Sequence, residues 1–315
     1  MSDDTSLQIP FPHRRSLHGP YAAALHRDWL TRHPLLPDPG HPSYAHWEVV
    51  ELAALGYPDA DPDELALAAD LMGFYFLFDD QFDGPIGRRP TEVTPICERL
   101  VAVLHGARPN AASPVETAFA DLWDRSVSGM PARWQARAAY NWEWYLASHP
   151  AEAAGRISER PPDRDGYLVL RRGTAAMETI FDMVERLGRF EVPAAILHHP
   201  VLRQLRQLAA DIPSLSNDVR SFPLEAPRGD VNNLVMIEQR ERRCSAEEAC
   251  AVVMAEAQLM VGRCHHLHGQ LPAVYRELGL ARVERIIAQR YADGLLTWLA
   301  GYLDWEARTG RYQTA

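Results

Sequence analysis

The chain has 315 residues, of which 47% are hydrophobic and 23% are charged, and its formal net charge is −10. This acidic balance disfavours nucleic acid or an anionic membrane surface as a partner, because both require a basic face. The first residues include acids and no apolar run, and no stretch approaches the roughly 20 apolar residues that span a bilayer. We therefore expect a cytoplasmic protein with no stable membrane insertion.

Helical signals follow one another along the chain. Residues 1–50 contain many prolines, which leave room only for short helical pieces such as one around 22–30, so we expect an N-terminal wrap. Asp61 as N-cap and Pro62 at the first helical position predict a helix that reaches about Phe82 and ends at the turn Gly84-Pro85. Further helical periods fall at 93–105, 115–128, 131–147, 165–187, 201–222, 245–268 and 272–307. No stretch alternates with period two for long enough to be a strand, so we predict an all-α fold and one domain over residues 1–315.

Three carboxylates mark the end of the helix predicted from Asp61. Phe76, Asp79, Asp80 and Asp83 stand at i, i+3, i+4 and i+7, so one helical stripe carries three acids below an aromatic ring. The residues before them are apolar nearly all round, which predicts burial, and buried carboxylates must be paired or bind a cation. Hard oxygen ligands of this kind select Mg²⁺. The alternative is a solvated acidic helix end, which the helix macrodipole opposes.

A second group of oxygen donors lies near residue 220. Asn217, Ser221 and Glu225 recur at i, i+4 and i+8 and offer amide, hydroxyl and carboxylate oxygens on one stripe, a set that suits a hard ion. The alternative is the polar face of an amphipathic helix. Pro223 lies between Ser221 and Glu225, where we expect it to kink or end the helix.

Arginines accompany both groups of oxygen donors. They are Arg171 and Arg172, Arg228 shortly after the second group, and Arg311, which is followed by Tyr312 near the end of the sequence. Arginine forks are suited to phosphate. In a chain with 42 acidic residues, the alternative for each of them is a surface ion pair.

These motifs together resemble the bacterial class I terpene cyclases, in particular the sesquiterpene cyclases. The resemblance rests on the aspartate-rich DDxxD motif at 79–83, the NDxxSxxxE motif at 217–225, the pair Arg311-Tyr312, and the flanking text FLFDD.FDGP and GRFEVP. It covers nearly the whole chain. It implies an all-α bundle around a central apolar cavity, and Mg²⁺-dependent cyclisation of a linear isoprenyl diphosphate, with farnesyl diphosphate as the expected substrate.

The resemblance also implies a metal cluster of three Mg²⁺ ions. Asp79 would bridge two of them, Asp83 is counted with the metal ligands, and Asp80 would support the cluster from behind or orient arginines. A third ion is expected on the second motif, with three ligands: Asn217, Ser221 and Glu225.

Diphosphate contacts follow from the resemblance in the same way. Arg171 matches the diphosphate sensor of the family, and Arg228, Arg311 and Tyr312 match further contacts, so we expect catalysis to depend on Arg171, Arg311 and Tyr312 together with Asp79. Many relatives carry a lysine directly before the glutamate of the second motif. This chain has Leu224 there, so one cation is missing.

The expected cavity would hold the hydrocarbon chain and stabilise a carbocation on aromatic faces. By the resemblance, Thr174 and Ala175 line it at a break in the helix after Arg171. Aromatic candidates, about half of which we expect to be core residues instead, are Tyr75, Phe76, Phe82, Trp298, Tyr302 and Trp305. Crowding by the rings beside the aspartate motif, Tyr75, Phe76, Phe78 and Phe82, favours a C15 substrate. Small residues could return the space: Gly73, Ala175, Ala176 and Gly301.

Other functions compete with this interpretation. A diterpene cyclase acting on geranylgeranyl diphosphate is the nearest alternative. A chain-elongating prenyl transferase would normally carry a second aspartate-rich motif, where this chain has Asn217-Asp218. A non-catalytic helical scaffold is disfavoured by the intact motifs. The interpretation is also compatible with a homodimer.

The cysteines and histidines do not predict a further metal site. Three histidines, His265, His266 and His268, follow a cysteine, but adjacent residues point to different helix faces and no second cysteine stands at ligand spacing. The four cysteines are scattered and predict reduced, mostly buried thiols: Cys97, Cys244, Cys250 and Cys264.

Overall fold

The computed structural model describes residues 7–36, 42–158, 162–228 and 230–312, which contain helices and no strand. The prediction of an all-α fold is confirmed. The longer helices are α1 (Gly19–Arg32), α3 (Val49–Gly56), α4 (Pro62–Asp79), α5 (Pro90–Leu104), α6 (Pro114–Val127), α7 (Ala132–Ile157), α8 (Arg164–Thr174), α9 (Met177–Gly188), α11 (Pro200–Glu225), α12 (Leu234–Arg242), α13 (Ala246–Glu277) and α14 (Arg282–Arg308). The short ones are α2 (Pro42–Ala45), α10 (Ala194–Leu197) and the 3-10 turns η1 (Asp80–Phe82), η2 (Pro85–Arg88), η3 (Ala226–Arg228) and η4 (Gly310–Tyr312).

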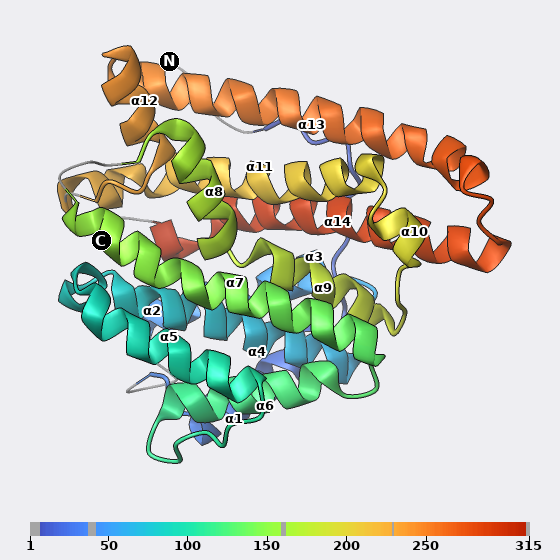
Figure 1. The fold of residues 1–315 in the computed structure, drawn as a ribbon, viewed down its shortest axis with the longest axis horizontal. Coiled ribbons are helices and arrows are strands. Elements are labelled where there is room, and N and C mark those ends of the chain that lie inside the picture. Colours follow the sequence, from blue (N-terminus) through green and yellow to red (C-terminus); the bar gives the residue numbers. More distant parts are fainter. Residues whose placement is uncertain (1–6, 37–41, 159–161, 229, 313–315) are drawn as a thin grey trace.

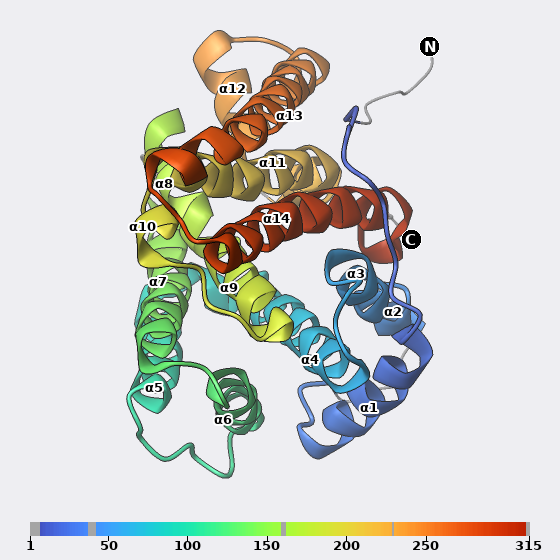
Figure 2. The same ribbon diagram turned by 90° about the vertical axis from the view of Figure 1, so that its right-hand side faces the viewer.

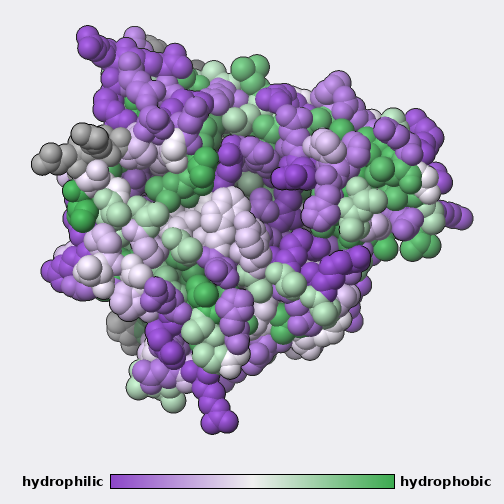
Figure 3. Space-filling model, viewed as in Figure 1, coloured by the Kyte–Doolittle hydropathy of each residue, from purple (hydrophilic) through white to green (hydrophobic). Residues whose placement is uncertain are grey.

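The helices form a bundle. Figures 1 and 2 show α13 at one edge and α1 and α6 at the opposite edge, with α11, α14, α7 and α4 between them. α11 packs on both α13 and α14, α14 packs on α3, and α3 packs on α4. Hydrophilic and hydrophobic residues are interspersed on the face shown in Figure 3, as expected when most large apolar side chains lie between the helices. No helix within the described ranges is long and apolar enough to cross a membrane.

α4 lies inside the bundle because it is apolar nearly all round. Residues 64–75 are all buried. Pro62 occupies the first helical position as predicted, and Asp61 before it has an extended backbone, although its side chain makes no cap hydrogen bond.

The aspartate-rich motif spans the end of α4 rather than a continuous helix. The prediction that the helix reaches Phe82 was wrong, since α4 ends at Asp79 and η1 follows. The N–H of Asp83 donates to the carbonyl of Asp80 at 3.3 Å, an i to i+3 bond that tightens the last turn. Asp80 and Asp83 therefore stand on a 3-10 turn beside the helix end.

Other helix boundaries also differ from the periodic pattern. The segment 165–187 is two helices, because Ala176 adopts a left-handed backbone with φ of 57° between them. α13 continues through Pro272 to Glu277, and the break before α14 falls at Gly279, which has φ of 62°. Pro272 is exposed, so the carbonyl that loses its partner there can face water. α3 was missed because a short apolar run shows no clear period.

Two glycines bring α3 against α14. A Cβ atom on Gly301 would lie 2.6 Å from the carbonyl oxygen of Leu55, and a Cβ atom on Gly56 would lie 2.7 Å from Cδ1 of Trp298. A side chain at Gly301 would require the backbone of α3 to move, and one at Gly56 would require the ring of Trp298 to move. Gly301 therefore serves this close packing and does not widen the cavity, contrary to expectation. Gly73 likewise faces His26 and Tyr44, since its Cβ atom would lie 2.6 Å from the Tyr44 oxygen.

Candidate active site

A cavity of about 330 Å³ opens between α4, the α8–α9 break, α11 and α14. Its mouth is polar and its interior is apolar. It is lined by Trp47, Leu52, Met72, Tyr75, Phe76, Asp79, Asp80, Asp83, Tyr145, Arg171, Thr174, Ala175, Ala176, Met177, Ile180, Pro213, Ser214, Asn217, Ser221, Leu224, Glu225, Arg228, Trp298, Tyr302, Arg311 and Tyr312. Both oxygen-donor motifs and three of the four singled-out arginines thus meet at one opening.

Asp79 is the innermost acid of the aspartate motif. Its side chain is 46% accessible because it faces the cavity, yet protein surrounds it on the other sides. The protein that surrounds the carboxylate keeps most bulk water away from it, which raises the pKa of Asp79 well above its ordinary value. The nearby carboxylates of Glu152, Asp83 and Asp80 raise this pKa further. Oδ1 of Asp79 lies 4.0 Å from Nδ1 of His149, which is beyond hydrogen-bond distance, and both ring nitrogens of His149 lack a partner among the described residues. Such a carboxylate is poised to accept a cation.

Asp80 is already paired, in contrast to Asp79. Nη2 of Arg311 donates to Oδ1 of Asp80 at 2.5 Å, and Nη1 donates to Oδ2 at 3.2 Å. The guanidinium carbon of Arg311 lies 4.4 Å from the ring centres of both Trp47 and Phe76, so two aromatic faces hold the cation in place. Arg311, near the C-terminal end of the described chain, is therefore held in a fixed position at the mouth of the cavity.

Asp83 and Arg228 form the outer edge of the mouth. Nη1 of Arg228 donates to Oδ2 of Asp83 at 3.3 Å, and both side chains are about half exposed. Burial raises the pKa of Asp83, and Asp80 adds to the effect. Screening by solvent makes this pair weaker than the Arg311 pair.

The second motif stays on one helical stripe. We expected Pro223 to kink or end the helix, but α11 does not end there and continues to Glu225. Pro223 is exposed and lies in the last turn, where losing one backbone bond is tolerated. Oγ of Ser221 is buried and makes no regular hydrogen bond to a described residue, although it lies close enough to Glu225 to oppose the rise of its pKa.

Glu225 is held by a residue that the sequence analysis missed. Nδ2 of Asn233 donates to Oε2 of Glu225 at 2.9 Å and to the carbonyl of Asp218 at 2.7 Å. Burial raises the pKa of Glu225 to about 7, with Asp218 as the next cause. Asn233 is the N-cap of α12, and an asparagine before an apolar run is a signal that could have located it.

Arg171 connects the second motif to the C-terminal pair. Its Nη2 donates to Oδ1 of Asn217 at 2.6 Å, and Nδ2 of Asn217 donates to the hydroxyl of Tyr312 at 2.8 Å. Nε of Arg171 lies 3.2 Å from Oδ1 of Asp218. Arg172, by contrast, binds Asp211 through two hydrogen bonds of 2.8 and 2.9 Å and does not line the cavity.

The α8–α9 break presents Thr174, Ala175 and Ala176 to the cavity. Ala176 carries the left-handed backbone, which costs an alanine about 1–2 kcal/mol. The hydroxyl of Thr179 donates to the carbonyl of Ala176 at 2.7 Å and shares a hydrogen bond of 2.7 Å with the hydroxyl of Tyr75. α4 therefore supports the strained turn from behind.

Two of the expected cavity aromatics lie outside the lining. Phe82 packs against Phe78 and His149, with ring centres 5.1 and 5.0 Å apart, because the 3-10 turn rotates it away from the cavity. Trp305 stacks on the far side of Phe76 at 5.4 Å, and its Nε1 donates to the carbonyl of Trp47 at 2.8 Å. The prediction that Phe82 and Trp305 line the cavity was wrong. The lining does contain Tyr75, Phe76, Trp298 and Tyr302.

α7 contributes a stripe that the sequence analysis also missed. Tyr145, His149 and Glu152 stand at i, i+4 and i+7, and ligand atoms of His149, Glu152 and Asp79 lie within 4.8 Å of one another. Burial lowers the pKa of His149 to about 3, and Arg156 lowers it further, so the ring is neutral. The helical spacing of these polar residues in an otherwise apolar helix face was the available signal.

The donor set of the cavity fits a hard divalent cation. Carboxylate, amide and hydroxyl oxygens converge, the pKa of Asp79 and of Glu225 is raised chiefly by burial, and Oγ of Ser221 lacks a regular partner. Each of these features is what a site shows when its ligands have been arranged for an ion.

Comparison with known proteins identifies the class. The family model "Terpene synthase family 2, C-terminal metal binding" matches residues 70–260, which include both oxygen-donor motifs. The chain belongs to this terpene synthase family. The resemblance to bacterial class I terpene cyclases is confirmed, and the chain is a terpene cyclase, a lyase that acts on an isoprenyl diphosphate.

Individual relatives match along nearly the full chain. The crystal structure of germacradien-4-ol synthase from Streptomyces citricolor has a TM-score of 0.91 and 60% identity, covering 98% of this chain and 100% of that chain. Pentalenene synthase of Streptomyces avermitilis is 35% identical over 99% of this chain and 94% of its own. A (-)-beta-caryophyllene synthase ((2E,6E)-farnesyl diphosphate cyclizing) of Saccharothrix espanaensis is 34% identical over 98% of this chain and 88% of its own.

Proposed function

We propose that this terpene cyclase ionises farnesyl diphosphate and cyclises the resulting cation. A relative whose name specifies farnesyl diphosphate, at 34% identity over 98% of the chain, supports the choice of a C15 substrate. The observation that carries the proposal is the meeting of Asp79, Arg171, Asn217, Arg311 and Tyr312 at the mouth of an apolar cavity. Residues 1–315 would act as one catalytic domain.

The mouth residues would bind the diphosphate group. Three Mg²⁺ ions held by Asp79 and Asp83 on one side and by Asn217, Ser221 and Glu225 on the other would make the diphosphate a better leaving group. Arg171, Arg228, Arg311 and Tyr312 would donate hydrogen bonds to its oxygens. Because Arg171 already donates to Asn217, a bound diphosphate would compete for that donor, whereas the hydroxyl of Tyr312 accepts from Asn217 and can still donate its own hydrogen to the diphosphate.

The apolar interior would protect the cation. When the C–O bond breaks, its electron pair leaves with the diphosphate and an allyl cation remains. The rings of Tyr75 and Trp298 line the cavity and can each contribute roughly 0.5–2 kcal/mol of cation–π stabilisation. Phe76 also lines the cavity but contributes less, since one face holds Arg311 and Trp305 stacks on the other side of the ring.

One observation argues against chain elongation. Asp218, the only acid in the place of a second aspartate-rich motif, is buried and accepts hydrogen bonds from the hydroxyl of Tyr167 at 2.5 Å and from the N–H of Leu234 at 2.9 Å. It does not line the cavity. This part of α11 therefore presents no second aspartate to the cavity, where a prenyl transferase would normally carry a second aspartate-rich motif.

Incubation of the purified protein with the C10, C15 and C20 diphosphates tests the proposal. We expect a cyclic C15 product and diphosphate release with Mg²⁺, and loss of both with a chelator. Preferred turnover of the C20 diphosphate would contradict the proposed C15 substrate. Longer linear products would contradict the proposed cyclisation. Gel filtration would show whether the protein is a homodimer, and cell fractionation would test the expected cytoplasmic location.

A further inference from the structure

A second cavity lies next to the active-site cavity. It has a volume of about 180 Å³ and is formed by the end of α3, residues 57–60, α9 and α14. Its rim carries charged side chains, among them the ion pair of Arg14 and Asp59, whose carboxylate side chain is 71% exposed. No step of the proposed function uses this space.

The two cavities are neighbours on three helices. One residue of each helix lines the active-site cavity and another, one turn away, lines the second cavity: Leu52 and Gly56 on α3, Ile180 and Val184 on α9, and Trp298 and Gly294 on α14. Four residues of a helix span about 6 Å. A single layer of side chains therefore separates the two spaces.

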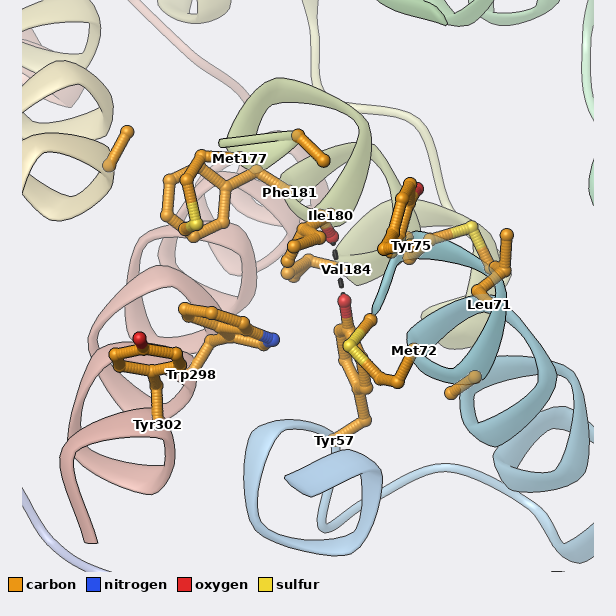
Figure 4. Packing of buried hydrophobic residues seen from close by; sticks show 14 of the residues in the cluster. Tyr57, Leu71, Met72, Tyr75, Met177, Ile180, Phe181, Val184, Trp298 and Tyr302 are labelled. Atoms are coloured by element: carbon orange, nitrogen blue, oxygen red, sulfur yellow. Dashed lines mark hydrogen bonds between the residues drawn. The ribbon is translucent and has the colours of Figure 1, made fainter. Parts of the chain in front are cut away.

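Tyr57 is the central side chain of that layer. It follows α3, is 6% exposed, and its hydroxyl donates to the carbonyl of Ile180 at 2.8 Å, so it spans the distance from α3 to α9. Trp298 lies beside it, close enough to oppose the rise in the pKa of Tyr57 that burial causes. Figure 4 shows Tyr57 reaching Ile180, with Trp298 on one side and Met72 on the other.

We propose that Tyr57, together with Trp298, is the wall that limits the substrate to fifteen carbons. The second cavity has somewhat more than half the volume of the first, whereas one further isoprene unit lengthens a fifteen-carbon chain by a third. Joining the cavities would therefore provide enough room for a C20 chain. This inference rests on the proposed function, because it concerns the depth of the same cavity.

Competition between equimolar C15 and C20 diphosphates, with Mg²⁺ present, tests the wall. In Tyr57→Ala we expect the ratio of kcat/KM for C20 over C15 to rise by about tenfold or more, since discrimination by a steric wall is lost. Val184→Ala thins the same layer from the side of the second cavity. It should shift the ratio in the same direction by about threefold.

Two matched variants separate the wall from general loosening. Tyr57→Phe keeps the ring and removes only the hydrogen bond to Ile180, so the ratio should stay close to the wild-type value. Leu187→Ala enlarges the second cavity without opening it, and should also leave the ratio unchanged. If Tyr57→Ala does not fold, the C20 over C15 ratio of kcat/KM in Val184→Ala tests the wall instead.

The outcomes distinguish the two proposals. If the wild type cyclises the C15 substrate while Tyr57→Ala and Val184→Ala keep its substrate ratio, the wall is overturned and the cyclase function stands. An equal shift in Leu187→Ala would also overturn the wall. If the wild type turns over none of the diphosphates, the proposed function fails and the wall fails with it.

Discussion

The mouth and the floor of the cavity satisfy their polar groups in opposite ways. At the mouth, Oγ of Ser221 lacks a regular partner, as do both ring nitrogens of His149 behind Asp79, and burial raises the pKa of Asp79 and Glu225. We call the apolar end of the cavity, near α3, α9 and α14, the floor. There the hydroxyl of Tyr57 donates to the carbonyl of Ile180, the hydroxyl of Tyr75 shares a hydrogen bond with that of Thr179, and glycines bring α3 against α14. Nε1 of Trp298 is the exception there.

This difference follows from what each end must hold. An unsatisfied buried polar group costs about 1–3 kcal/mol, which a protein recovers only if a ligand supplies the partner. A diphosphate with its metal ions supplies such partners, and a hydrocarbon chain does not. The position of the unsatisfied groups therefore marks the end of the cavity at which the charged part of the substrate binds.

The largest effect should come from removing the central ligand of the mouth. We expect Asp79→Ala to lower kcat/KM for the C15 substrate by about a hundredfold or more, or roughly 2.7 kcal/mol, while the circular dichroism spectrum stays helical. Asp304→Ala, which removes an acid paired with Arg308, is the control and should retain activity. Retention of more than about a tenth of wild-type turnover in Asp79→Ala would count against the metal site.

A smaller effect is expected when one charge of the second motif is removed. Glu225→Gln should raise the Mg²⁺ concentration for half-maximal turnover by about tenfold, because the carboxylate is the only formal charge in that ligand set. Asn233→Ala should act in the same direction, since it frees the carboxylate of Glu225. An unchanged Mg²⁺ titration in Glu225→Gln would mean that this carboxylate binds no ion.

The aromatic clamp on Arg311 should matter less. Trp47→Leu removes one of the two rings that hold the guanidinium, a contact worth about 0.5–1 kcal/mol, so KM should rise by roughly threefold with little change in kcat. Trp47→Phe keeps a ring and should stay near the wild type. Equal losses in both variants would point to packing against Tyr44 instead.

The smallest effect concerns stability and pH. Burial raises the pKa of both Glu225 and Glu306 to about 7. For a carboxyl group with a raised folded-state pKa, the stabilisation is complete below the unfolded pKa of about 4.3 and is lost as the pH rises through 7. The unfolding temperature without Mg²⁺ should therefore fall by a few degrees between about pH 5 and pH 8.

A substitution behind the mouth sharpens this prediction. Glu306 binds Ser216 and Tyr302 and does not line the cavity. Glu306→Gln should therefore flatten the pH dependence of unfolding without changing the Mg²⁺ requirement, whereas Glu225→Gln should change both. A pH dependence that is the same in wild type and both variants would assign it to other groups.

Local chemistry and periodicity were enough to locate much of the site. The helical spacing of Asn217, Ser221 and Glu225 survives in α11, and all three line the cavity together with Asp79. Which aromatic rings line it could not be predicted, because the face of a helix depends on its neighbours. The prediction failed for Phe82 because this residue lies on a 3-10 turn, and it failed for Trp305 because Phe76 stacks between Trp305 and the cavity.

The sequence by itself determined the all-α fold, the burial of α4 and the two groups of oxygen donors, because each depends on residue types and on spacing within one helix. Only the tertiary structure decided that Trp47 and Phe76 hold Arg311, that His149 and Glu152 approach Asp79, and that the hydroxyl of Tyr57 reaches the carbonyl of Ile180 on α9. These contacts join residues tens to hundreds of positions apart. Their partners are set by how helices pack on one another, which no local pattern encodes.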